Sequence, residues 1–229
     1  QVVEEAKLGR FILDRFMSKD VEAQSAAARL RLSFEELGPT FVKLGQLMAS
    51  RPDLVPPDFL EELSKLHDQV PTVPFAEIER VMVNHFGKDL NQVFDDFDQQ
   101  PLGAASIAQV HRATLKGGVG VVVKVQRPGI EKVIREDLVL LEFLAGLLDR
   151  YVPQVKPYNP IGVVEEFAKT LAMETDFVIE ANNIRRFQSN FASEPNIKIP
   201  NVYSEFTGRR VLVMEALDGI PLSHRNALD

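Results

Sequence analysis

The stretch VVVKVQRPG, residues 121–129, places one lysine in a run of valines that otherwise has the pattern of a buried strand. Successive side chains of a strand point to opposite faces of the sheet, so the odd-numbered valines share one face and Lys124 lies on the other with Val122 and Gln126. A lone strand lysine is usually exposed at an edge, or its stem covers apolar surface while the ammonium reaches water. A desolvated ammonium instead needs a carboxylate or a phosphate beside it. The role of Lys124 is therefore the question that this sequence raises.

The composition is that of an ordinary globular protein, with 45% hydrophobic and 26% charged residues among 229. The formal net charge of −7 argues against a nucleic-acid partner, which would require a basic surface. Cysteine is absent and the four histidines lie far apart in sequence, so we expect no metal site in this chain. No apolar run approaches the ~20 residues that a transmembrane helix needs. We expect no transmembrane segment in this chain.

Helical periodicity dominates the first part of the chain, which we assign, over residues 1–89, to an all-helical extension. Gly38 and Pro39 suit the end of one helix and the first turn of the next, and Gly87 suits the end of the last helix. The predicted helices are 3–17, 21–37, 40–50, 58–69 and 74–86.

Alternating apolar and polar residues begin near residue 90, and Gly117-Gly118 lies between two strand-like runs as in a hairpin. This order predicts an α+β unit over residues 90–217, with an antiparallel sheet of about five strands. His111 is interpreted as a hydrogen-bonded structural histidine of the second strand. The predicted strands lie near 93–98, on both sides of the glycine pair, and at 197–203 and 209–217, with helices at 130–151 and 161–191.

The small-residue loop PLGAAS, residues 101–106, precedes the hairpin, and a carboxylate-rich helix comes later. Protein-kinase small lobes combine these parts: a loop covers the nucleotide phosphates, a strand lysine contacts them, and a helix glutamate holds the lysine. The valines around Lys124 would give a dry wall against which adenine could lie. The pattern therefore predicts a nucleotide site.

Four stretches of the sequence, in this order, resemble the UbiB/ADCK family of atypical protein-kinase-like proteins: LGPTFVKLGQLMASRPDLVPPDFLEELSKLHDQVP, PLGAASIAQVHRA, VVVKVQRPG and METDFVIEANN. The resemblance implies a kinase-like small lobe behind a helical extension that carries a K-x-G-Q motif. It also implies that residues 218–229 form the hinge and the start of a large lobe that is missing from these residues.

The resemblance assigns roles to individual residues. It implies that Lys124 contacts the nucleotide and that Glu180 pairs with it. It further implies that an alanine-rich loop replaces the usual glycine-rich one and biases nucleotide preference, and that Lys43 points toward the nucleotide. The implied site residues are Lys43, Gly45 and Gln46 (K-x-G-Q); Gly103, Ala104, Ala105 and Ser106 (alanine-rich loop); Glu174 and Asp176 (E-x-D); and Met214, Glu215 and Ala216 (hinge, with Met214 as gatekeeper and the other two offering backbone groups to adenine).

The E-x-D motif poses a geometric problem, because Glu174 lies two positions before Asp176 and would point away from it on a regular helix. Asp176 and Glu180 are four positions apart and share a face. Either the helix is distorted at the motif, or Glu174 and Asp176 serve different partners.

The resemblance implies that ATP or ADP binds and that the chain is part of an atypical kinase or ATPase supporting isoprenoid quinone biosynthesis, of ubiquinone or plastoquinone. It implies peripheral association with the cytoplasmic or organelle-lumen face of a membrane, with a lipid or quinone precursor and quinone-biosynthesis proteins as partners. No H-x-D…N or D-F-G segment occurs, so we expect Mg²⁺ only with the missing large lobe and no catalysis by this chain alone. Two alternatives stay open: a pseudokinase scaffold that recruits biosynthetic enzymes or lipid, and a plain helical adaptor with a small sheet.

Overall fold

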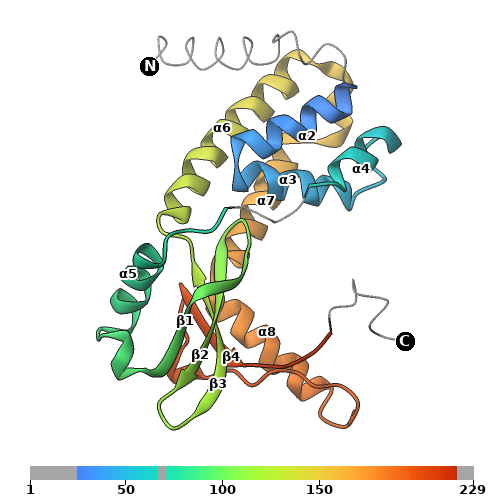
Figure 1. The fold of residues 1–229 in the computed structure, drawn as a ribbon. Helices are drawn as coiled ribbons and strands as arrows, with labels where there is room; N and C mark the ends of the chain where they lie inside the picture. The colour runs from blue at the N-terminus through green and yellow to red at the C-terminus, as the bar shows by residue number, and fades with distance from the viewer. Residues whose placement is uncertain (1–24, 67–70, 221–229) are drawn as a thin grey trace. The chain divides into compact units, whose positions relative to one another are not determined.

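The computed structural model describes residues 25–66 and 71–220 (Figure 1). The predicted helix at 3–17 lies outside the described residues. The chain divides into two compact units, Gln1–Asp68 and Gln69–Asp229.

Three helices form the described part of the first unit. Ser25 caps the first of them, because its Oγ accepts a hydrogen bond from the amide of Ala28 at 3.1 Å. Gly38, with a φ of 105°, ends this helix and Pro39 begins the next, as the sequence predicted. The third helix is shorter than the predicted 58–69 segment. The helices are α2 (Ala26–Leu37), α3 (Pro39–Ala49) and α4 (Pro57–Leu63).

The second unit is built on a four-stranded antiparallel sheet with the order β1-β2-β3-β4. The α+β fold with a kinase-like small lobe is therefore confirmed. Its helices are α5 (Phe75–Phe86), α6 (Ile130–Tyr151), α7 (Pro160–Glu174) and α8 (Phe177–Asn190), and its strands are β1 (Phe94–Ala104), β2 (Ala108–Leu115), β3 (Val119–Gln126) and β4 (Val211–Glu215).

The hairpin between β2 and β3 turns at Gly117 and Gly118, whose φ angles of 97° and 85° are open to glycine at no steric cost. The predicted strand at 197–203 does not form, and this stretch contributes only an isolated bridge between Val202 and Met214. Pro200 lies in this stretch, and a proline has no N–H to donate to a ladder. The sheet therefore has four strands among the described residues, not about five.

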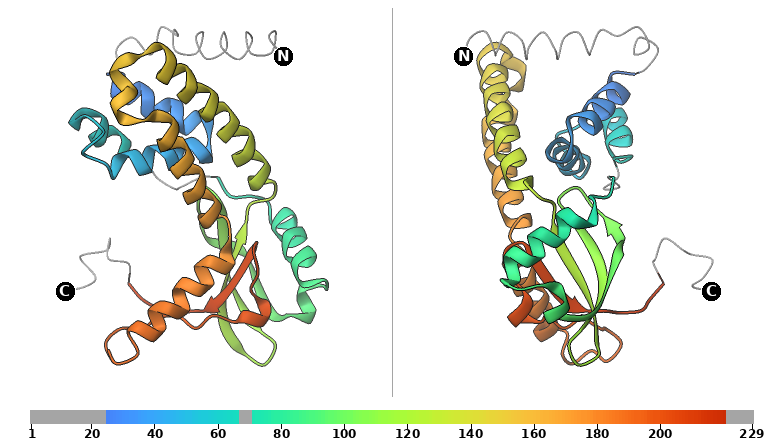
Figure 2. Two further views of the ribbon diagram at one scale, coloured as in Figure 1. Left: turned by 180° about the vertical axis from the view of Figure 1, so that it is seen from behind. Right: turned by 60° about the vertical axis from the view of Figure 1, so that its left-hand side comes forward.

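One face of the sheet is covered by α5 (Figures 1 and 2). Val121, Val123 and Val125 are fully buried on this face, in one cluster with Ile78 and Met82 of α5. The sequence placed this helix in the N-terminal extension that ends at residue 89. Because α5 packs on the sheet, the division between the units falls earlier, after residue 68.

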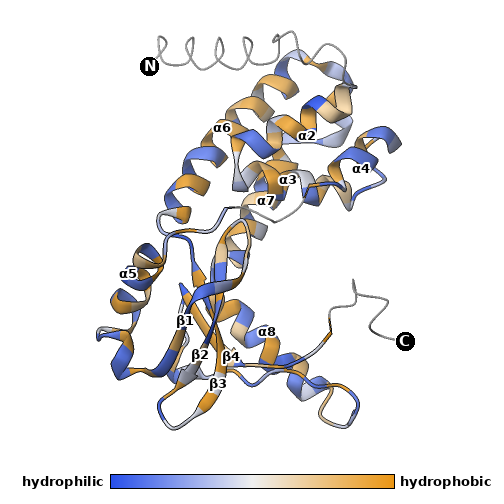
Figure 3. Cartoon of the chain, in the orientation of Figure 1, coloured by the Kyte–Doolittle hydropathy of each residue, from blue (hydrophilic) through white to orange (hydrophobic). Residues whose placement is uncertain are grey.

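The other face of the sheet carries α8, so α5 and α8 lie on opposite sides of it (Figure 2). Helix α6 has the predicted bounds, and its buried residues recur at helical spacing; Figure 3 shows hydrophobic and hydrophilic stretches alternating along it. Within the described ranges, no helix has both the length and the apolar character needed to cross a bilayer.

Candidate functional site

An ion pair joins β3 to α8. The Nζ of Lys124 donates to Oε1 of Glu180 at 2.9 Å and to Oε2 at 2.7 Å. The side chains keep 23% and 35% of their exposure, so both charges are partly desolvated and remain reachable from solvent. The structure thus brings together the two residues to which the resemblance gave the central roles.

Phe177, in the first turn of α8, forms the floor beneath this pair. Its ring is completely buried, and the Nζ of Lys124 lies 4.9 Å from the ring centroid. An ammonium over an aromatic face is attracted by the ring quadrupole. Lys124 is therefore held from two sides by α8.

The E-x-D motif lies at a break between two helices. Glu174 is the last residue of α7, and Asp176 is the N-cap of α8. Oδ1 of Asp176 accepts from the amide of Val178 at 2.9 Å, and its Oδ2 lies 3.3 Å from the Nε of Arg209. The predicted continuous helix at 161–191 was wrong, and the distorted alternative is the observed one.

The alanine-rich loop connects β1 to β2. Gly103 and Ala104 end β1, and the amide of Ala105 donates to the carbonyl of Ala108 at 2.8 Å. Ser106 is fully buried. A Cβ added at Gly103 would meet no atom within 4 Å, so neither packing nor backbone conformation requires a glycine there.

The register of the sheet places the start of this loop in one row with the lysine. Gly103 is paired with Val110, and Val110 is paired with Lys124. Directly paired residues face the same side, and adjacent strands are about 4.8 Å apart. The loop therefore begins two strands from Lys124, on the same face of the sheet.

The predicted hinge lies at the end of β4, where Met214 pairs with Val122. The amide of Glu215 donates to the carbonyl of Asn201 at 2.8 Å, and that of Ala216 donates to Gly120 at 3.2 Å. Both N–H groups are therefore used within the protein. That these two residues bind adenine stays a prediction. Because their N–H groups are used, we expect their carbonyl oxygens to make the contact.

The carboxylate of Glu215 is also used within the protein. It lies 2.8 Å from the Nζ of Lys198 and accepts a hydrogen bond from the amide of Asn201 at 3.0 Å. The hydrogen bond from Lys198 is the main reason that the pKa of Glu215 is lowered. This side chain fixes the hinge to the preceding segment.

The apolar surface beside Lys124 differs from the predicted one. Val121, Val123 and Val125 pack under α5 and cannot reach a ligand. The apolar residues of the neighbouring strands and of β3 on the lysine face include the half-buried Val110, Val122 and Met214, while Leu212, which pairs with Lys124, is fully buried. The proposed dry wall is therefore wrong in its residues, because the face of β3 that carries most of its valines is the core face.

Two residues of the K-x-G-Q motif have packing roles within the helical unit. A Cβ at Gly45 would lie 2.8 Å from a ring carbon of Phe34 and would also overlap Leu66. The side-chain Nε2 of Gln46 donates to the carbonyl of Leu66 at 3.3 Å. Lys43 is half-buried on α3. That Lys43 points toward a nucleotide stays a prediction.

His111 lies in the core and belongs to a neutral network. Its Nδ1 is 2.9 Å from the carbonyl of Asp98, and its Nε2 is 3.1 Å from the amide nitrogen of Gln109. Burial lowers the pKa of His111. These contacts agree with the structural interpretation of this histidine.

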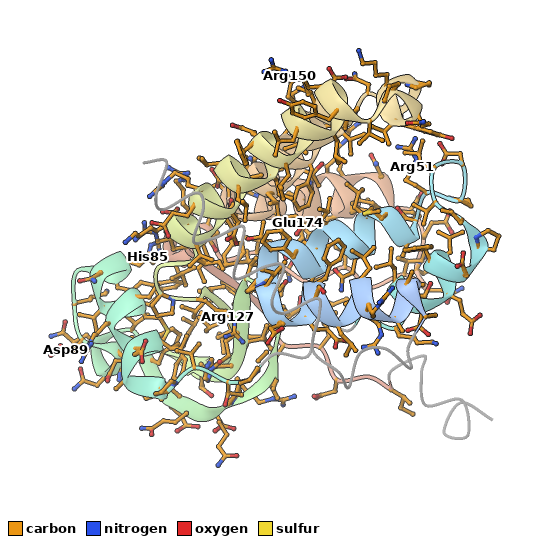
Figure 4. The ribbon with its side chains drawn as sticks, turned by 90° about the horizontal axis from the view of Figure 1, so that it is seen from above. Arg51, His85, Asp89, Arg127, Arg150 and Glu174 are labelled. Carbon is orange, nitrogen blue, oxygen red and sulfur yellow. The ribbon has the colours of Figure 1, made fainter. Side chains whose placement is uncertain are left out.

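A hollow of about 350 Å³ lies elsewhere, between α5, the 127–129 turn and the start of α6. None of the predicted site residues lines it. Gln126 and Arg127 do, and neither was predicted as a site residue, although Gln126 is the last residue of the lysine strand and Arg127 directly follows it. Figure 4 marks Arg127, together with Glu174 of the E-x-D motif.

Comparisons with known proteins agree with this architecture. Residues 65–229 match the ABC1 atypical kinase-like domain. Two proteins named "Probable protein kinase UbiB" are similar: that of Marinobacter nauticus is 44% identical over 90% of this chain and 38% of its own length. That of Aeromonas hydrophila subsp. hydrophila is 46% identical over 88% of this chain and 37% of its own length.

A solved structure is also similar, that of Rv3197 from Mycobacterium tuberculosis in complex with erythromycin. It has a TM-score of 0.57 and 29% identity, and the match covers 79% of this chain and 45% of that one. The chain spans about two fifths of the length of the curated relatives named above. With the family domain matching most of its length, the chain belongs to the ABC1 atypical kinase-like family, and the predicted resemblance to UbiB proteins is confirmed.

Proposed function

We propose that this chain forms the nucleotide-binding half of an ATP-dependent phosphotransferase or ATPase cleft. The observation that carries the proposal is the Lys124–Glu180 ion pair on the face of the sheet opposite the α5 core. A pair this exposed stabilises a fold by about 1 kcal/mol at most, so stability alone gives little reason for placing a lysine in this strand.

The surroundings of the pair suit an adenine nucleotide, ATP or ADP. The ammonium of Lys124 would contact phosphate oxygens while Glu180 keeps it oriented. The alanine-rich loop starts in the same row of the sheet, where it could cover the phosphates. Val122 and Met214 offer apolar surface for the base.

Magnesium does not fit the residues at hand. Among the residues that the structure describes, no group of three or more acidic or histidine side chains could hold a metal ion. Asp176 is also engaged as a helix cap. We therefore assign no step to Mg²⁺ here, expect it only with a large lobe, and expect no phosphoryl transfer from this chain alone.

The biological setting is proposed from the resemblance to the UbiB/ADCK family. We place the activity in isoprenoid quinone biosynthesis, of ubiquinone or plastoquinone, by a peripheral protein at the cytoplasmic or organelle-lumen face of a membrane. The partners would be a lipid or quinone precursor and quinone-biosynthesis proteins. A pseudokinase scaffold would give no reason for a lysine and a glutamate to meet beside the alanine-rich loop, so the ion pair favours the enzyme.

Calorimetric titration of the chain with ATP and ADP tests the proposal. Lys124→Met should weaken binding about tenfold to a hundredfold, the effect of losing a hydrogen bond to a charged group. Lys116→Met is the matched control, because Lys116 also pairs with a carboxylate, Asp95 at 2.9 Å, but lies at the exposed end of the hairpin. Equal affinities of the two variants would contradict the proposal, and magnesium-dependent turnover by this chain alone would contradict its predicted inactivity.

A further inference from the structure

Gln126, two residues after Lys124, is a buried carboxamide at the end of β3, with 2% of its surface exposed. Its Nε2 donates to the carbonyl of Thr175 and, at 3.3 Å, to the carbonyl of Arg209. Thr175 is the middle residue of the E-x-D motif, at the break between α7 and α8. A single side chain of the lysine strand therefore binds the backbone of the motif.

The break determines where α8 begins. The amide of Phe177 donates to the same carbonyl of Arg209, at 3.1 Å, and Asp176 caps the helix immediately before it. Glu180 follows within the first turn. A shift of the break would therefore move Glu180 relative to Lys124, and the ion pair would lengthen or exchange partners.

The side chain of Arg127 binds the alanine-rich loop. Its Nε donates to the carbonyl of Ala105 in the alanine-rich loop at 2.8 Å, and its Nη2 donates to the carbonyl of Pro71 at 2.7 Å. Its own amide donates to the carbonyl of Ile107 at 3.0 Å. Burial lowers the pKa of this guanidinium, which makes no ion pair among the described residues. The guanidinium of Arg127 therefore binds backbone carbonyls, those of Ala105 and Pro71.

We infer that Gln126 and Arg127 are positioning residues of the nucleotide cleft, Gln126 through the E-x-D break and Arg127 through the alanine-rich loop. The inference rests on the proposed function for its effect on nucleotides, and on the hydrogen bonds alone for its effect on geometry. Neither residue needs to touch the nucleotide. Because Gln126 ends β3 and Arg127 comes directly after it, the end of one strand sets the positions of the lysine, its glutamate and the loop.

The first test measures the acylation rate of Lys124 by acetic anhydride, read by mass spectrometry with Lys132 as the internal standard. Gln126→Leu removes the donor to Thr175, and the rate at Lys124 should rise about threefold or more, the effect of one lost hydrogen bond. The same change at Gln109 is the matched control. Gln109 is also a buried carboxamide, 1% exposed, but it binds Val73 on the core face at 2.8 Å.

Gln109→Leu should lower the stability of the fold comparably and leave the rate at Lys124 unchanged. An equal rise in both variants would show a merely structural role and overturn the assignment of Gln126. An unchanged rate in Gln126→Leu would also overturn it. Neither result depends on whether a nucleotide binds.

The second test uses Arg127→Lys, which keeps the charge but cannot reproduce the fork of the guanidinium that binds two carbonyls. Hydrogen exchange at residues 105–108 should accelerate about tenfold, the acylation rate at Lys124 should stay unchanged, and the ratio of ATP to ADP affinity should change about threefold. Unchanged exchange in the loop would overturn the role of Arg127. Unchanged affinity ratios with faster exchange would overturn its effect on the nucleotide.

The two proposals fail in different ways. If the unmodified chain binds neither ATP nor ADP, the proposed function fails, while the acylation and exchange rates still decide whether the two residues position the motifs. If nucleotides bind and Lys124→Met weakens their binding, but Gln126→Leu leaves both the acylation rate of Lys124 and the nucleotide affinity unchanged, only the positioning role of Gln126 fails.

Discussion

The two faces of β3 are built from alternate residues of the same strand, yet they differ in nearly every property. On the α5 face, Val123 has no exposed surface, and His111, its partner on β2, is buried and hydrogen-bonded. On the α8 face, Lys124 and Glu180 keep part of their exposure and form an ion pair. The first face is buried from Val121 to Val125, whereas the second is reachable from solvent at Lys124 and buried only toward its end, at Gln126.

The two faces of β3 therefore have different tasks: the α5 face stabilises the fold, and the α8 face carries the residues proposed to bind the nucleotide. Burying a valine stabilises a fold by about 1.5 kcal/mol or more, whereas a partly exposed ion pair adds about 1 kcal/mol at most. Substitutions on the α5 face should therefore act on folding, and substitutions on the α8 face should act on binding.

The strongest contrast is expected from one isosteric change made on each face. Val123→Thr places a hydroxyl in the core without a partner and should lower the free energy of unfolding by about 2 kcal/mol. Val122→Thr, on the half-buried lysine face, should lower it by about 0.5 kcal/mol or less. Urea unfolding of both variants checks this. Equal losses would show that the two faces are buried alike.

Alternation along the strand allowed these faces to be predicted, but not the element that covers each. Period two shows which residues share a side, and the grouping of the valines against Lys124 was right. It does not show whether α5 or a ligand lies on that side, which is why the adenine wall was placed on the wrong residues. The helix itself was predicted at 74–86, but its place on the sheet was missed because Ile78 and Met82 reach the sheet only through tertiary packing.

Site residues that belong to sequence motifs could be predicted. Site residues that act through backbone hydrogen bonds could not. The pairing of Lys124 with Glu180 followed from the family resemblance, since the two residues lie 56 positions apart and no periodicity links them. A distortion at the E-x-D motif was predicted only as one of two alternatives, because Asp176 is acceptable both within a helix and as a cap. Gln126 donates the hydrogen bond that holds the break, and a glutamine at the end of a strand does not by itself indicate such a role.

The pH dependence of stability should also follow the buried face. Burial lowers the pKa of His111 below its unfolded value of about 6.5, although the carbonyl and the charge of Asp98 partly oppose this. Between the two pKa values the unfolded chain binds more protons than the folded chain. The contribution of His111 to the free energy of unfolding is therefore fully present above about pH 6.5 and is lost as the pH falls below this value. The slope is at most about 1.4 kcal/mol per pH unit.

Urea unfolding at pH 7.5 and pH 5.5 measures this slope. His111→Gln should flatten it, whatever the variant costs at pH 7.5. The carboxylates whose pKa values are lowered, such as Asp95 and Glu215, titrate below this range and should not contribute. A slope that survives His111→Gln would place the titrating group elsewhere.

The smallest change in stability is expected on the lysine face. Glu180→Gln keeps the shape of the side chain and a carbonyl oxygen for Lys124, so the free energy of unfolding should change by less than about 1 kcal/mol. Nucleotide affinity should nevertheless fall about fivefold, because a neutral acceptor holds the ammonium less firmly than a carboxylate does.

Calorimetry and urea unfolding of this one variant measure both quantities, and the double variant with Lys124→Met shows whether they belong to one pair. Because the glutamate acts through the lysine, its substitution should have little further effect on affinity once the lysine is gone. A loss of more than about 2 kcal/mol in stability, the size expected for a core position, would contradict the division between the faces. Additive losses of affinity would instead mean that Glu180 contributes to the cleft by a route other than the ion pair.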